Sequence, residues 1–190
     1  MRYKLTLLCS VFLICSCGQN GSQGILTNHE NLAVDLFSSL DSLSLAVENI
    51  DIPSGTLLTN VASKEVVSLE SLKLDNSLVL YLSEIQCSAC ISQEMDMLKA
   101  HYDPSEVTLL CDYQSMRDLK LYLLINKIEF PAYIVHSEFP VLIRSLTNPT
   151  YFRLGSNYRP SSVFFASYGA KEKSNSFHQA MSVLLKNWSK

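Results

Sequence analysis

The sequence predicts an α/β fold in which a central mixed β-sheet is flanked by helices. Leu78–Leu82 is a short apolar run rich in branched and aromatic residues, which is typical of a buried strand. A helical pattern follows, with apolar side chains at steps of four, three and four on one face: Ile91, Met95, Leu98 and Tyr102. A second alternation repeats this order, with a strand expected at Val107–Cys111 and a helix at Ser115–Ile128. Such alternation favours parallel βαβ pairing with right-handed crossovers.

The rest of the chain adds elements on both sides of this unit. Before it, we expect a helix within His29–Val47, whose end at Leu43–Ile52 could equally be a strand, then a hairpin of Leu57–Val61 and Glu65–Leu69 and a polar connection at Glu70–Asn76. After it, we expect strands at Ala132–Val135 and Ser161–Ser167, a short helix at Phe139–Leu146, a loop at Asn148–Arg159, an edge strand at Lys171–Ser176 and a closing amphipathic helix at Phe177–Trp188.

The N-terminus has the features of an export signal. Arg2 and Lys4 precede the apolar stretch Leu5–Ile14, which is too short to span a membrane as a mature helix. The stretch ends in Ile14-Cys15-Ser16-Cys17, which resembles a lipobox with lipid attachment at Cys17. An ordinary secretory signal is the alternative. We therefore expect a lipoprotein signal peptide at residues 1–16, a tether and helical segment at residues 17–50, and one folded domain at residues 51–190.

Net charge and cysteine count limit the classes of function that fit the sequence. The formal net charge is −3 and no basic cluster occurs, so nothing indicates nucleic-acid binding. Of the six cysteines, two lie in the signal and Cys17 is committed to lipid, which leaves Cys87, Cys90 and Cys111. Three thiols cannot form a multi-bridge scaffold. In an exported chain, where disulfides persist, one C-x-x-C pair with an odd cysteine fits a redox site better; Cys111 ends a buried strand and is expected to be core.

The C-x-x-C motif stands between the predicted strand and helix. This placement puts Cys87 at a helix N-terminus, where unpaired backbone N–H groups and the helix dipole stabilise a thiolate, which is the nucleophilic form of cysteine. Cys90 lies one turn further along and would resolve a mixed disulfide. A zinc site would need two more ligands, and His101 and Cys111 lack ligand spacing. Zinc and an inert buried bridge remain as alternatives to the redox pair; the scattered histidines are expected to be surface or structural.

The strand, turn, C-x-x-C and helix resemble the active site of thioredoxin-like proteins, and the flanking residues resemble the TlpA/ResA-like thiol–disulfide oxidoreductases of the bacterial envelope. The resemblance covers about residues 51–190. The family usually has tryptophan before the first cysteine, where this chain has Gln86. The resemblance implies a thioredoxin-like fold, and a membrane-anchored, periplasm-facing enzyme that exchanges disulfides with protein thiols and disulfides, without a cofactor or metal.

The resemblance also implies a proline facing the cysteines. Arg159-Pro160-Ser161 precedes an apolar strand, as the family's cis-proline does, so we expect these three residues to bind substrate and the Arg159 guanidinium to favour thiolate at Cys87. A trans proline that starts an edge strand is the alternative. The family often has a buried acid near the second cysteine, but Glu84 is better explained as a solvated carboxylate in the turn.

The sequence leaves one alternative function open and argues against another. Because of these departures from the family, the chain could instead be a lipid-anchored binding module with a structural, non-cycling disulfide. Peroxiredoxins share the fold, but their proline and Ser/Thr before the reactive cysteine are replaced here by Ser83-Glu84-Ile85-Gln86.

Overall fold

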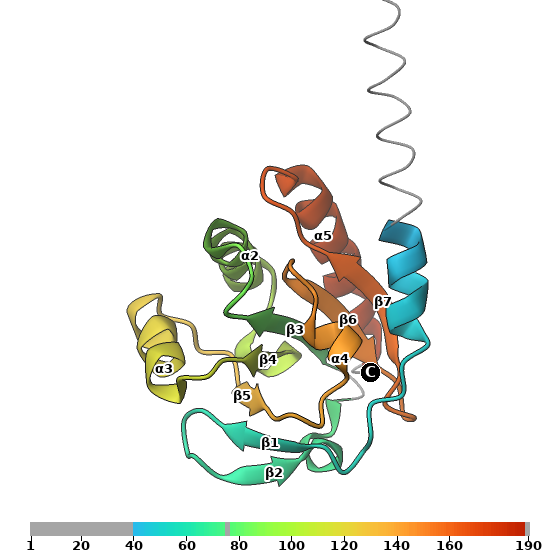
Figure 1. The fold of residues 1–190 in the computed structure, drawn as a ribbon. Helices are drawn as coiled ribbons and strands as arrows, with labels where there is room; N and C mark the ends of the chain where they lie inside the picture. The colour runs from blue at the N-terminus through green and yellow to red at the C-terminus, as the bar shows by residue number, and fades with distance from the viewer. Residues whose placement is uncertain (1–39, 75–76, 189–190) are drawn as a thin grey trace, which may run out of the picture. The chain divides into compact units, whose positions relative to one another are not determined.

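The structure is a computed structural model, and it describes residues 40–74 and 77–188 (Figure 1). The predicted signal peptide, Cys17 and most of the tether lie outside these residues. Residues 40–48 are helical, so the part of the predicted N-terminal helix that the structure describes is a helix. No helix in the described ranges is long and apolar enough to cross a membrane.

A seven-stranded mixed sheet forms the centre of the domain. Its strands are β1 (Leu57–Asn60), β2 (Val66–Ser68), β3 (Leu78–Ser83), β4 (Val107–Asp112), β5 (Ala132–Val135), β6 (Thr150–Leu154) and β7 (Pro160–Phe165). They lie in the order β2-β1-β5-β4-β3-β6-β7. The strands β3, β4 and β5 are parallel, whereas the other pairings are antiparallel. This arrangement confirms the predicted α/β, thioredoxin-like fold.

Helices cover both faces of the sheet. They are η1 (Leu69–Leu72), α2 (Ser88–His101), η3 (Pro104–Glu106), α3 (Met116–Ile125), α4 (Val141–Arg144) and α5 (Lys171–Trp188). Apolar residues of α2, α3 and α5 form one core cluster with β3, β4 and β5, and residues of η1 and α4 form a second cluster with the strands' opposite side chains. Every residue of β3 is buried because this central strand is covered on both faces. The apolar run that predicted it is continuous for the same reason.

Two predicted elements are wrong. The segment expected to be a loop, Asn148–Arg159, contains β6, which pairs antiparallel with β3. The segment expected to be an edge strand, Lys171–Ser176, is the first part of α5. In both cases the decisive contacts are distant in sequence. The β6 residues form a strand because they pair with β3, and Ser174 of α5 is buried against α2 by a polar contact described below.

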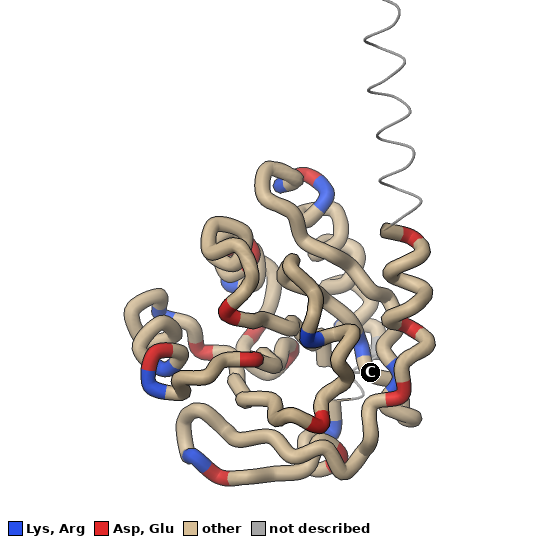
Figure 2. Tube along the Cα trace, viewed as in Figure 1, with Lys and Arg blue, Asp and Glu red and all other residues tan. Residues whose placement is uncertain are grey.

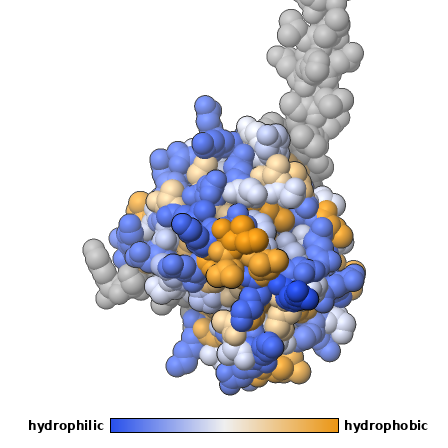
Figure 3. Space-filling view, turned by 90° about the vertical axis from the view of Figure 1, so that its left-hand side faces the viewer, coloured by the Kyte–Doolittle hydropathy of each residue, from blue (hydrophilic) through white to orange (hydrophobic). Residues whose placement is uncertain are grey.

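The surface of the described chain is mixed in character. Acidic and basic residues alternate around it, with no broad region of one sign (Figure 2). On the side where α3 lies, hydrophobic side chains gather within a hydrophilic surround (Figure 3). Helix α3 contributes Leu121, Leu124 and Ile125 to the exposed hydrophobic residues.

Candidate active site at the start of helix α2

Cys87 is the N-cap residue of α2, as the sequence predicted. Its backbone is extended, and its sulfur accepts a hydrogen bond from the Cys90 backbone N–H at 3.4 Å. The side chain is exposed. The hydrogen bond from the Cys90 thiol, then the backbone N–H groups of Cys90 and Ala89, lower the pKa of Cys87. An accessible sulfur with a lowered pKa at a helix N-terminus has the properties of an attacking nucleophile.

Cys90 lies one turn into α2 and is 5% exposed. Burial, followed by its hydrogen bond to Cys87 and the charge of that sulfur, raises its pKa, while the Tyr168 backbone N–H acts in the opposite direction. The two sulfurs therefore differ in both access and protonation. The roles of attacking thiol for Cys87 and resolving thiol for Cys90 stay a prediction, and this asymmetry is what they require.

The placement of Arg159, Pro160 and Ser161 beside the sulfurs is wrong. Pro160 pairs with Leu154, at the end of β6 far from the cysteines, and the described residues contain no cis peptide bond. Arg159 forms an exposed ion pair with Asp51, with Nη2 3.2 Å from Oδ2. The reason is strand direction: β6 and β7 run antiparallel, so the start of β7 lies at the opposite end of the sheet from the end of β3.

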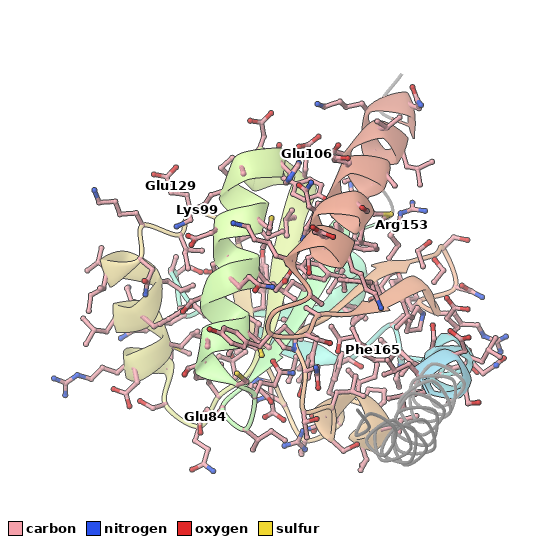
Figure 4. The ribbon with its side chains drawn as sticks, turned by 90° about the horizontal axis from the view of Figure 1, so that it is seen from above. Glu84, Lys99, Glu106, Glu129, Arg153 and Phe165 are labelled. Atoms are coloured by element: carbon pink, nitrogen blue, oxygen red, sulfur yellow. The ribbon has the colours of Figure 1, made fainter. Side chains whose placement is uncertain are left out.

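Figure 4 shows the two ends of the sheet from above. Glu84 lies at the end of the sheet where α2 begins, and Arg153 of β6 lies toward the other end. The register agrees, because Arg153 pairs with Leu78 at the start of β3. Substrate contacts at Arg159 would therefore be remote from the cysteines.

A different proline occupies the position expected from the resemblance. Pro149 directly precedes β6, whose first residue, Thr150, pairs with Tyr81 near the end of β3 that leads to the cysteines. The Pro149 carbonyl accepts a hydrogen bond from the Ala166 N–H at 2.9 Å. The signal was present in the sequence as a proline followed by threonine and an apolar strand, but Pro160 carries the same local pattern.

Gln86, the residue in place of the family's tryptophan, is 6% exposed. Its Oε1 accepts a hydrogen bond from the Ser83 N–H at 3.2 Å. Its Nε2 donates to the carbonyls of Leu146 at 3.2 Å and Asn148 at 2.9 Å. Gln86 therefore joins the turn before Cys87 to the segment before Pro149.

The turn carboxylate Glu84 supports α3 rather than Cys90. Its Oε1 accepts a hydrogen bond from the backbone N–H of Gln114 at 2.7 Å, and it remains exposed. The exposed side chain agrees with the prediction that Glu84 is a solvated carboxylate in the turn. Nearby, Asp112 at the end of β4 accepts hydrogen bonds from Arg144 at 2.8 Å and from the Tyr81 hydroxyl at 3.3 Å.

A buried polar cluster between α2 and α5 was not predicted. Glu94 lies four residues after Cys90 on α2, and both it and His178 of α5 have no exposed surface. Glu94 Oε2 is 3.2 Å from His178 Nε2, while Oε1 accepts hydrogen bonds from Ser174 Oγ at 2.8 Å and Gln93 Nε2 at 3.1 Å. On the other side of the ring, the Tyr102 hydroxyl lies 3.1 Å from His178 Nδ1.

Burial acts to raise the pKa of Glu94, but hydrogen bonds from His178, Ser174 and Gln93 outweigh it and the net shift is downward. Gln93 Nε2 also reaches the Ser167 carbonyl at 3.5 Å, next to the Tyr168 N–H that faces Cys90. The cluster is thus connected to the surroundings of Cys90. The signal in the sequence was weak: Glu94 lies four residues after Cys90, which places both on the same face of α2.

Cys111 has no exposed surface, and burial strongly raises its pKa. It lies in the core cluster with β3 and α2, as predicted. Among the residues that the structure describes, no group of three or more His, Cys, Asp or Glu side chains is arranged to hold a metal ion.

Comparisons with known proteins give structural likeness alone. No protein-family model matches the sequence, and no curated protein matches it. Among solved structures, the chain is similar to a Chlorobium tepidum protein proposed to be the thiol:disulfide interchange protein DsbE, with a TM-score of 0.48 and 19% identity over 70% of this chain and 95% of that one.

A thiol-disulfide isomerase from Corynebacterium glutamicum gives a TM-score of 0.47 and 16% identity over 74% of this chain and 96% of that one. A secreted Mycobacterium tuberculosis disulfide oxidoreductase gives a TM-score of 0.46 and 9% identity, covering 66% and 96%.

Proposed function

We propose that the protein is a thiol–disulfide oxidoreductase of the bacterial cell envelope, anchored to a membrane by lipid on Cys17, that exchanges disulfides with cysteine-bearing proteins. The observation that carries the proposal is the asymmetry of the cysteine pair. Cys87 is an exposed helix N-cap with a lowered pKa, and Cys90 is buried beside it with a raised pKa. A purely structural bridge requires neither an exposed thiolate nor this difference.

The exchange follows from this arrangement. The Cys87 thiolate attacks one sulfur of a substrate disulfide, the substrate S–S bond breaks, and the other substrate sulfur leaves as a thiolate. Cys90 then loses its proton and attacks the Cys87 sulfur, which releases the second substrate thiolate. The substrate has gained two electrons and the protein holds a Cys87–Cys90 disulfide; oxidation of a substrate dithiol is the same sequence in reverse.

Two residues with exposed apolar side chains lie near the pair, one in sequence and one in the fold. Ile85, two residues before Cys87, is 64% exposed, and Tyr168, whose backbone N–H faces Cys90, is 72% exposed. Apolar and aromatic side chains suit contact with an extended, partly unfolded peptide. This surface supports a protein substrate over a small charged thiol.

The decisive experiment is trapping. Cys90→Ser leaves Cys87 able to attack but removes the resolving thiol, so mixed disulfides with substrate proteins should accumulate. Cys87→Ser is the matched control and should trap nothing. A pair with a reduction potential below about −300 mV, as in structural disulfides, and no trapped adducts would reject the enzyme in favour of the binding module.

Anchoring is tested separately. The lipobox-like sequence before Cys17 supports lipid attachment. Cys17→Ser should abolish labelling by a lipid precursor and release the protein from the membrane fraction, or leave its signal uncleaved. Unchanged processing and membrane partition would refute the anchor without touching the redox proposal.

A further inference from the structure

The side chain of Gln86 bridges two segments that meet only in the folded protein. One is the turn at residues 83–86, which closes through the Gln86 N–H to the Ser83 carbonyl at 3.1 Å and through the Ser83 N–H to Gln86 Oε1 at 3.2 Å. The other is the segment at residues 146–149 before β6. Three of the four hydrogen-bonding positions of this buried amide are used: the oxygen accepts from Ser83, and the nitrogen donates to Leu146 and to Asn148.

The segment at residues 146–149 is held from its far side as well. Asn148 Nδ2 donates to the Ala166 carbonyl at 2.7 Å, and the Ala166 N–H donates back to the Pro149 carbonyl at 2.9 Å. The Asn148 carbonyl also accepts a hydrogen bond from Thr150 Oγ1 at 2.9 Å. Gln86 supplies the side-chain contacts from the cysteine side. Without it, the segment would stay attached through Ala166 and through the pairing of Thr150 with Tyr81, but it would lose its link to the turn before Cys87.

We propose that Gln86 is a positioning residue, which holds the segment at residues 146–149 at a defined place beside Cys87 so that a substrate peptide contacts the segment and the attacking sulfur together. The inference rests on the proposed exchange function. It gives a role to the residue that replaces the family's tryptophan: a buried amide clamp in place of an aromatic ring. Misplacing such a segment by about 1 Å can cost about 100-fold in rate.

The nucleophilicity of Cys87 itself should not depend on this clamp. Its sulfur is stabilised by the thiol and N–H of Cys90 and by the N–H of Ala89, all within α2. Helix α2 has a buried face of its own, and the side-chain hydrogen bonds of Gln86 go to Ser83, Leu146 and Asn148, none of which lies in α2. The positioning role can therefore be separated from thiol chemistry by measuring both.

The test compares Gln86→Leu with the wild-type chain. The rate of disulfide exchange with a cysteine-containing peptide disulfide should fall at least tenfold, while the rate of Cys87 alkylation by iodoacetamide should change less than twofold. Backbone hydrogen exchange in the segment at residues 146–150 should become faster, with no change in α2. Gln179→Leu, the same substitution at an exposed position of α5, should leave all three rates unchanged.

A second variant keeps the test valid if leucine prevents folding. In Gln86→Glu, the introduced carboxylate faces two carbonyl oxygens and cannot donate, so the clamp opens. Burial and these oxygens disfavour its charged form, so it takes up a proton more readily than a free carboxyl and can then donate to one carbonyl. Its exchange rate relative to the wild-type rate at the same pH should therefore rise as the pH falls.

The outcomes distinguish a failure of the positioning role from a failure of the proposed disulfide exchange. Exchange within twofold of wild type for Gln86→Leu, or unchanged hydrogen exchange at residues 146–150, would overturn the positioning role. If the wild-type chain itself fails to exchange disulfides while Gln86→Leu still loosens the segment, the clamp stands and the enzyme proposal fails.

Discussion

Replacing Glu94 with alanine should destabilise the protein far more than a surface substitution on the same helix. The Glu94 carboxylate is fully buried, and it contacts Ser174, Gln93 and His178 at 2.8, 3.1 and 3.2 Å. Alanine would leave the Ser174 hydroxyl and the His178 ring nitrogen buried without this partner. It would also open a cavity between α2 and α5.

The size of the effect follows from these contacts. The Ser174 hydroxyl and the His178 ring nitrogen each stay buried without this partner, which costs about 1–3 kcal/mol per group, or about 2–6 kcal/mol together. For a domain of this length, such a loss lowers the midpoint of thermal unfolding by about 4–24 °C. Glu94→Gln keeps the volume and can still accept the Ser174 hydrogen bond, so we expect a smaller loss of about 1–3 kcal/mol.

The measurement is thermal and urea unfolding followed by circular dichroism. Asp96→Ala is the control, because Asp96 lies on α2 but is 78% exposed and only pairs with Lys99 at 3.0 Å. Exposed pairs contribute about 0–1 kcal/mol, so this variant should unfold close to wild type. A loss in Glu94→Ala no larger than in Asp96→Ala would refute the argument that the cluster supports the fold.

The pH dependence gives an independent check. Because the folded-state pKa of Glu94 is lowered, its carboxylate adds stability above its unfolded value of about 4.3, and this contribution is lost as the pH falls through the folded value. The difference in unfolding free energy between wild type and Glu94→Gln should therefore be largest near neutral pH and shrink below about pH 4. A difference that grows on acidification would contradict a lowered pKa.

Two other predictions concern the site. In the reduced protein, Cys87 should be alkylated first and at a pH below the usual thiol pKa of about 8.5, followed by Cys90, with Cys111 unreactive until unfolding; pH-dependent labelling read by peptide mass would show it, and equal labelling of all three would contradict the assigned roles. Pro149→Ala should slow disulfide exchange several-fold, because Pro149 directly precedes Thr150, which pairs with Tyr81 near the end of β3 that leads to the cysteines. Pro160→Ala, at the other end of the sheet, should leave the exchange rate unchanged. The opposite ranking in a peptide-disulfide assay would contradict a role for Pro149 in exchange.

Local sequence patterns predicted the part of the site that lies in one stretch of sequence, the C-x-x-C motif at the start of α2. The run at Leu78–Leu82 and the apolar face of α2 each lie within one element, and together they place Cys87 at a helix start. The other half depends on which strand pairs with β3. Pro149 and Pro160 each precede a serine or threonine and an apolar stretch, so the sequence alone offers both, and only the β3–β6 register selects Pro149.

Buried polar contacts escaped prediction for a different reason. Hydrophobic periodicity identifies faces by apolar residues, but α5 buries Ser174 and His178, and α2 buries Glu94. Taken alone, each of these residue types is usually found at the protein surface. Their burial becomes favourable only when all are paired, and that pairing spans about 80 residues of sequence. The same holds for Gln86, which reaches carbonyls some 60 residues away.

In the proposed exchange, the raised pKa of Cys90 would let one pair perform two steps in order. Burial is the largest cause, followed by the hydrogen bond to the Cys87 sulfur and the charge on that sulfur. The charge exists only while Cys87 is a thiolate, and the hydrogen bond is strongest then. Once Cys87 has formed a mixed disulfide, that charge is gone, and the Tyr168 N–H still favours the thiolate form of Cys90. The resolving thiol therefore becomes easier to deprotonate only after the attack has occurred. Such an order would keep Cys90 protonated in the resting reduced protein and available when the substrate is bound.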